Sequence, residues 1–135
     1  MTLSEIKAQV MFQTNNDSDD LADFEPHIGE YVNDGYDRLV FVWAKEHVSE
    51  TSATYPTLSE GTDVPNLPEW THKYLADWAT WLVYRNGNPQ KQQRGYAFRQ
   101  SFEDMLSRVY NSGGLAGLNE DGTQKQYRNF INIPK

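Results

Sequence analysis

The chain contains no cysteine, and this absence excludes several kinds of site. Disulfide bonds, thiol catalysis and cysteine-ligated metals all need that side chain. The three histidines stand far apart, at positions 27, 47 and 72, which leaves little for a zinc site. We therefore expect neither a metal ion nor a cofactor.

Long apolar runs are also missing. Mean hydropathy is −0.76, and no stretch approaches the roughly 18 apolar residues that a membrane-spanning helix needs. The first five residues lack both the basic start and the apolar stretch of a secretory signal. We therefore expect a soluble chain with no membrane partner, and 135 residues suit one domain.

Known catalytic motifs are absent too, including the glycine-rich phosphate loops and the nucleophile elbow. Glu30, Asp34 and Asp37 recur at i, i+4 and i+7, on one face of a helix. Paired carboxylates act as general acid and base when they are buried, but a solvated face is the commoner reading. Since no nucleophile stands nearby, we expect no catalytic residue and no enzyme.

Charge is distributed unevenly along the chain, whose net charge is −7. Residues 1–66 hold 13 acidic and 3 basic residues, net −10, whereas residues 67–135 hold 6 acidic and 9 basic residues, net +3. The two halves either form a dipolar surface or attract each other, within one chain or between copies. The acidic total argues against general nucleic-acid binding.

Periodic apolar residues predict helices in the first third of the chain. Thr2 and Glu5 form a capping box that begins a helix over 3–13. A second helix is expected from 24 to about 47, with Asp23 as its cap and Gly35 at a close helix crossing. The run Leu39 to Ala44 also suits a buried strand, although length favours the helix.

A long proline-rich loop over 48–68 and a helical hairpin are expected next. The hairpin's first helix begins near Pro68 and carries four aromatic positions, mostly core. Gly87 suits a left-handed cap, while Asn88 and Pro89 begin a fourth helix that ends before Gly113. The fold class is therefore all-α: a small bundle of about four helices over 1–112, followed by an extended C-terminal tail over 113–135.

The fourth helix is basic, with Lys91, Arg94 and Arg99 along it. Basic helices bind phosphate, form a solvated face or pair with acidic faces. We favour pairing with Glu30, Asp34 and Asp37 of a neighbouring copy, because phosphate binding must overcome the acidic half. Such complementary faces on one chain allow a head-to-tail ring.

Three segments carry a resemblance to a known family. They are Thr2–Lys7, Tyr31–Leu39 and the stretch from Leu67-Pro68-Glu69-Trp70 through Arg85–Lys91. They resemble the head–tail connector (adaptor) proteins of tailed bacteriophages, over about residues 1–110. The order of elements also fits: short helix, long helix, proline-rich loop, helical hairpin.

The resemblance implies a virion structural protein located in the neck, and in the host cytoplasm during assembly. It implies a homo-oligomeric ring, commonly of twelve subunits, beneath the portal protein and above stopper or tail proteins. Viral DNA would pass through the ring without sequence-specific contact. Asp17, Asp19 and Asp20 are candidates for the channel lining, or for a solvated loop outside the ring. By resemblance to connectors with extended C-termini, the tail would bind the portal through Tyr127, Phe130, Ile131 and Ile133.

Two alternatives stay open. A neck stopper or head-completion protein would also be a virion structural protein, but it would lie at a different position in the neck. A small helical DNA-binding or regulatory domain would instead use the basic fourth helix.

Overall fold

The computed structural model describes residues 1–14, 24–44 and 54–112, and in these ranges every regular element is a helix. The prediction of an all-α bundle of about four helices is confirmed. The α-helices are α1 (Leu3–Gln13), α3 (Ile28–Ala44), α5 (Glu69–Arg85) and α6 (Pro89–Asn111), with a short 3₁₀ helix, η2 (Glu25–His27), before α3. The predicted tail lies outside the described residues.

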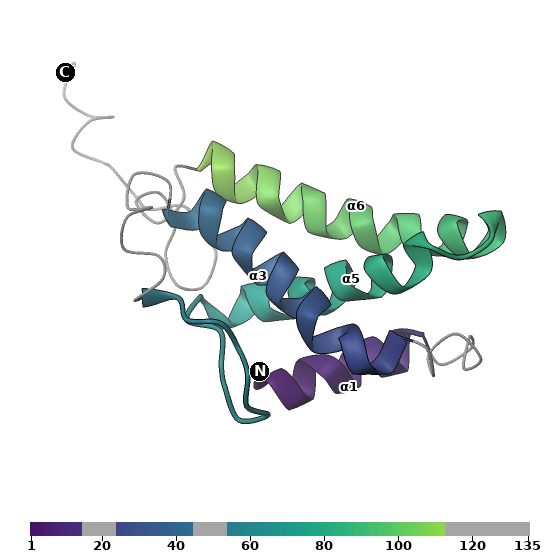
Figure 1. Ribbon diagram of the computed structural model, residues 1–135. Helices are drawn as coiled ribbons and strands as arrows, with labels where there is room; N and C mark the ends of the chain where they lie inside the picture. Colours follow the sequence, from purple (N-terminus) through teal and green to yellow (C-terminus); the bar gives the residue numbers. More distant parts are fainter. Residues whose placement is uncertain (15–23, 45–53, 113–135) are drawn as a thin grey trace, which may run out of the picture.

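Helix α5 is at the centre of the bundle (Figure 1). It forms an antiparallel hairpin with α6, is crossed by α3 and packs against α1. Eleven of its 17 residues are buried, because neighbouring helices cover it on most sides. The predicted hairpin of the third and fourth helices is therefore confirmed.

Helix α1 begins as its sequence predicts. The Thr2 hydroxyl accepts a hydrogen bond from the Glu5 N–H, and the Glu5 carboxylate accepts one from the Thr2 N–H. This capping box satisfies two backbone donors that the helix itself leaves without partners. Leu3, Ile6 and Val10 are then buried along one side, which attaches α1 to the core.

The start of the second predicted helix is less regular than its periodicity indicates. The chain forms the 3₁₀ turn at Pro26 and becomes α-helical only at Ile28, and it stays helical through Ala44. The predicted continuation to about 47 lies outside the described residues. Asp23, the predicted cap, lies outside the described residues, and Phe24 stands at the cap without a side-chain hydrogen bond. The apolar run ending at Ala44 is helical, so the strand alternative is wrong.

The turn between α5 and α6 confirms one predicted cap and corrects another. Asn88 accepts a hydrogen bond from the Lys91 N–H through its side chain, with Pro89 in the first helical position. Gly87 does not adopt the predicted left-handed conformation. A Cβ on Gly87 would instead lie 2.8 Å from the Lys91 Cβ, so close approach favours glycine there.

Two glycines allow the central helices to approach closely. A Cβ on Gly35 would lie 3.1 Å from Cδ1 of Trp78, where α3 crosses α5. A Cβ on Gly95 would lie 2.7 Å from Cε3 of Trp81, where α6 packs on α5. The predicted crossing at Gly35 is thus confirmed. Gly95 allows α6 to approach α5 closely in the same way.

The second half of the proline-rich loop is anchored to the bundle rather than extended from it. The Leu3 N–H donates to the Asp63 carbonyl at 2.7 Å, and the Ser4 N–H donates to the Gly61 carbonyl at 3.0 Å. These are helix N-terminal donors that lack partners within α1. The side chain of Leu58, 5% exposed, joins the core. The described part of the loop therefore belongs to the folded unit.

The aromatic residues form much of this core, as expected. Trp43, Trp78 and Trp81 are at most 7% exposed, while Trp70 is half-buried. Trp78 also stacks at a tilt on Phe102, with ring centroids 4.8 Å apart. These indoles stabilise the bundle by burial and are not arranged on the surface as a platform for bases.

Candidate interaction surfaces

Within residues 1–14, 24–44 and 54–112, no three His, Asp or Glu side chains gather in a way that could hold a metal ion. Among the same residues, no helix is both long and apolar enough to cross a membrane.

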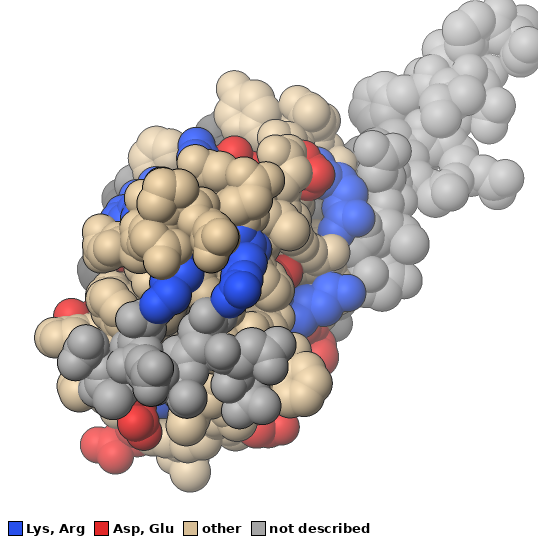
Figure 2. Space-filling view, turned by 90° about the vertical axis from the view of Figure 1, so that its right-hand side faces the viewer, with Lys and Arg blue, Asp and Glu red and all other residues tan. Residues whose placement is uncertain are grey.

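The first surface is the end of the bundle formed by the α5–α6 turn. From Trp78 to Phe102 the chain carries four basic residues and no acidic residue, against −7 for the whole chain. Figure 2 shows this end, where several Lys and Arg side chains lie together and the visible Asp and Glu side chains lie mainly at the margins. We call the four basic residues the basic cluster: Arg85, Lys91, Arg94 and Arg99.

The predicted basic residues do not share one face of α6. Lys91 and Arg94 are three residues apart and lie on one side, whereas Arg99 is about 140° further round the helix. Nε of Arg99 donates to Glu103 at 2.9 Å, and its guanidinium lies over the Trp81 ring at 5.4 Å. Arg99 is therefore already engaged within its own chain.

The predicted acidic residues do lie along one side of α3, but in different environments. Glu30 is exposed and lies 3.4 Å from Nδ1 of His27. Asp34 is half-buried, and its Oδ2 accepts from Nε of Arg38 at 2.8 Å and from Nε1 of Trp78 at 2.7 Å. Burial alone would raise the pKa of Asp34, but these two hydrogen bonds, together with the charges of Arg38 and Arg85, outweigh it and lower the pKa.

Asp37 differs from its neighbours because no hydrogen bond or ion pair to it occurs among the described residues. Partial burial raises the pKa of Asp37, and the nearby charge of Asp34 raises it further. A cation brought to this carboxylate from outside would relieve both effects.

The second surface is a groove between α3 and α6. It is an open depression of about 420 Å³, and we call it the α3–α6 groove. Its lining combines charged and apolar side chains: Asp34, Asp37, Arg38, Phe41, Val42 and Leu106. Phe41 is 69% exposed and is one of several large apolar side chains at the surface, with Phe12 and Tyr110.

Sequence analysis missed Phe41, Val42 and Leu106 as surface candidates. The apolar run from Leu39 to Ala44 indicated buried residues throughout. In the structure, Leu39 and Trp43 point into the core, and Phe41, two residues from each, lies about 200° round the helix. A helical projection of the run separates Phe41 from the buried stripe, and this signal was available in the sequence.

Three arginine side chains each lie over a tryptophan ring, so their guanidinium groups are held against the surface of the bundle. The guanidinium-to-ring distances are 4.8, 5.4 and 4.8 Å for the pairs Arg38–Trp78, Arg99–Trp81 and Arg108–Trp70. Each pair joins neighbouring helices by a cation–π contact. Part of the basic surface therefore also serves the packing of the indoles.

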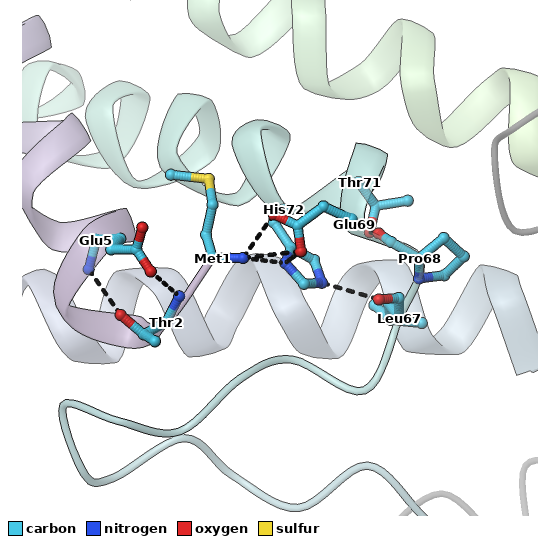
Figure 3. A network of polar contacts seen from close by, with 8 residues as sticks. All are labelled: Met1, Thr2, Glu5, Leu67, Pro68, Glu69, Thr71 and His72. Carbon is cyan, nitrogen blue, oxygen red and sulfur yellow. Dashed lines mark hydrogen bonds and ion pairs between the residues drawn. The ribbon is translucent and has the colours of Figure 1, made fainter.

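A polar network connects the start of the chain to the start of α5 (Figure 3). The Met1 amino group donates to both carboxylate oxygens of Glu69 at 2.8 and 2.9 Å, and to Nδ1 of His72 at 2.9 Å. Nε2 of His72 lies 2.8 Å from the Leu67 carbonyl, which only accepts, so the proton is on Nε2. The imidazole is therefore neutral.

His72 stands at a helix end and is buried there. It lies in the first turn of α5, but it is only 1% exposed. Burial lowers its pKa, and the hydrogen bond to the Leu67 carbonyl opposes this only in part. His72 is thus a neutral structural histidine under the loop.

A second polar network, partly buried, joins α1, α5 and α6. Oδ1 of Asp77 accepts from Nε2 of Gln13 at 2.9 Å, and Oδ2 accepts from the Ser101 hydroxyl at 3.0 Å. Oε1 of Gln13 in turn accepts from the Thr80 hydroxyl at 2.5 Å. Burial raises the pKa of Asp77 despite these hydrogen bonds. Through these hydrogen bonds, the Asp77 carboxylate on α5 links α1 to α6.

The remaining predicted site residues lie outside the described residues. These are the channel candidates Asp17, Asp19 and Asp20 and the portal-binding candidates Tyr127, Phe130, Ile131 and Ile133.

No family model, curated protein or solved structure matches this chain.

Proposed function

We propose that this protein is a head–tail connector (adaptor) of tailed bacteriophages. It forms a homo-oligomeric ring beneath the portal protein, joins the DNA-filled capsid to the tail and lets DNA pass. Its action is mechanical and electrostatic, and no step of it is catalytic. The C-terminal tail engages the portal, and stopper or tail proteins bind on the opposite side.

The observation that carries the proposal is the presence of two oppositely charged surfaces on one bundle. Arg85 and Lys91 flank the α5–α6 turn, in a segment without acidic residues, and Figure 2 shows basic side chains gathered at this end. Asp37 on α3 has no ionic partner among the described residues. Different surfaces of complementary charge favour a heterologous contact, which closes into a ring when the rotation permits. The sequence resemblance to connectors supports the same reading.

A charge-exchange experiment tests the interface. Arg94→Glu and Asp37→Arg are each expected to lower the mass of the assembled protein, because each brings like charges together. Combining the two substitutions restores opposite charges and is expected to restore the mass. Lys73→Glu is the matched control, since it makes the same charge change on the exposed surface of α5. Loss of assembly in the control, or no rescue in the double variant, contradicts this interface.

A neck stopper is the nearest alternative within the same class. It would bind below an adaptor ring and would make no contact with the portal. Capture of this chain by an adaptor ring, with no binding to the portal, favours the stopper.

The basic cluster also favours a second candidate function, a small DNA-binding domain. In that case the chain binds duplex DNA with an affinity that falls steeply with salt. Arg94→Ala and Arg99→Ala would then each weaken binding, and fluorescence anisotropy with a labelled duplex measures the effect. Absence of salt-sensitive binding removes this candidate.

A further inference from the structure

The α3–α6 groove combines features that suit an apolar, basic segment. Phe41, Val42 and Leu106 supply its apolar surface, and Asp37 supplies a carboxylate with no partner among the described residues. An occupant with apolar side chains would cover the first group from water. An occupant with a basic side chain would neutralise the carboxylate.

Helix α6 ends close to this groove. Figure 1 shows α3 and α6 ending at the same end of the molecule. Leu106 is six residues before Ser112, where α6 is capped, so about 9 Å of helix separates them. Twenty-three residues follow Ser112, and an extended chain covers about 3.4 Å per residue. The 23 residues are therefore long enough to extend back to the groove.

The last part of the chain has the composition that the groove requires. Residues 122–135 include three basic residues and no acidic residue. The same segment carries one aromatic pair and two isoleucines among polar residues: Tyr127, Phe130, Ile131 and Ile133. Its basic residues are Lys125, Arg128 and Lys135. The segment thus complements the groove in both polarity and charge.

We propose that residues 124–135 occupy the α3–α6 groove of their own chain before assembly, with a basic side chain against Asp37. The apolar side chains of the segment cover Phe41, Val42 and Leu106. The groove is then a holding site for the segment that, in the proposed function, engages the portal. The docking concerns the chain before assembly, and in the proposed ring Arg94 of a neighbouring copy would replace the segment at Asp37. Cross-linking within one chain measures the docking alone, so its failure is distinguishable from a failure of the ring.

Engineered cysteines test the docking in the full chain, because the natural sequence has none. One variant carries Val42→Cys in the groove together with Ile131→Cys. The matched control carries Ala97→Cys together with Ile131→Cys. Ala97 is an exposed α6 residue nine positions before Leu106, on the opposite side of the helix. Mild oxidation followed by a non-reducing denaturing gel separates cross-links within a chain from cross-links between chains.

We expect the groove pair to form a cross-linked monomer about tenfold faster than the control pair, because docking raises the effective concentration of the two thiols. Adding Asp37→Lys is expected to slow the groove pair to the control rate. Asp104→Lys makes the same charge change on α6 away from the groove lining and is expected to leave the rate unchanged. Thermal unfolding confirms that each variant is folded, and Leu106→Cys replaces Val42→Cys if that variant is not.

Three results overturn the proposal. Equal rates for the groove and control pairs mean that the segment does not dock there. A cross-linked dimer without cross-linked monomer means that the groove holds the segment of a second copy. Unchanged cross-linking with Asp37→Lys means that the carboxylate plays no part.

Discussion

The side-chain amide of Asn33 pairs with both backbone groups of Leu58, 25 residues further along the chain. Its Nδ2 donates to the Leu58 carbonyl at 2.9 Å, and its Oδ1 accepts from the Leu58 N–H at 2.9 Å. Nδ2 also donates to the Gly29 carbonyl at 3.0 Å. One asparagine on α3 therefore fixes the loop at the point where the Leu58 side chain enters the core.

Asn33→Asp is expected to destabilise the protein by about 1–3 kcal/mol, because it replaces a donor with an oxygen that faces two carbonyl oxygens. Asn66→Asp is the matched control, since Asn66 is exposed and its side-chain amide donates to the Thr54 carbonyl. Its effect is expected to stay within about 0.5 kcal/mol. Urea unfolding measures both, and equal losses would show that the pairing with Leu58 is not special.

Gly95→Ala is expected to destabilise the protein by about 1–3 kcal/mol. The added methyl would lie 2.7 Å from Cε3 of Trp81 and 2.9 Å from Cβ of Tyr84, so α6 must shift away from α5. Gly29→Ala is the control within a helix, because its methyl meets only the end of the flexible Lys7 side chain. That substitution is expected to stabilise by up to about 1 kcal/mol through helix propensity. Denaturant unfolding of both variants measures the contrast, and a stabilising Gly95→Ala contradicts the close contact.

Acidification is expected to destabilise the protein through His72. Its folded-state pKa is lowered by burial, so below the ordinary value of about 6.5 the unfolded chain binds a proton that the folded chain does not. The free energy of unfolding therefore falls as the pH decreases from about 6.5 towards the folded pKa. Above pH 7 both states are neutral at His72 and this contribution vanishes.

His72→Gln isolates that contribution, because glutamine does not titrate and still carries a donor for the Leu67 carbonyl. We expect the variant to lose less stability than the natural protein between pH 7 and pH 5.5. The free energy of unfolding at each pH provides the measurement. If the free energy of unfolding changes equally with pH in the two proteins, a group other than His72 takes up the proton.

Asp77→Asn is expected to raise the melting temperature at pH 7 by about 3 °C. Burial raises the pKa of Asp77, so above that pKa the folded state bears the cost of a buried charge. The asparagine amide can still bond to Gln13 and Ser101. The advantage should shrink as the pH falls through the folded pKa and the natural side chain becomes neutral. A lower melting temperature at pH 7 would show that the negative charge itself holds the helices.

The sequence predicted those features whose causes are local. The capping box of Thr2 and Glu5 and the cap at Asn88 depend on residues three apart, and both appear as expected. The crossing at Gly35 was also predictable, because glycine in a helix needs a packing reason. Periodicity was less reliable at Phe24, where Pro26 replaces the first α-helical turn by a 3₁₀ turn.

Features that depend on long-range contacts could not be read from the sequence. The pairing of Asn33 with Leu58 joins residues 25 apart, and the contact of Met1 with His72 joins residues 71 apart. The groove depends on α6 lying beside α3, which no local pattern specifies. The ion pairs of Asp34 with Arg38 and of Arg99 with Glu103 are local, at i and i+4. By contrast, the hydrogen bond from Trp78 to Asp34 joins residues 44 apart.

The central claim is that this chain assembles into a ring and binds a portal. Light scattering of the full chain, alone and mixed with a portal protein from the same virus, tests it most directly. The account predicts a species of about twelve times the 15.6 kDa chain mass, either alone or on the portal. A mass of 15.6 kDa in every mixture would contradict it.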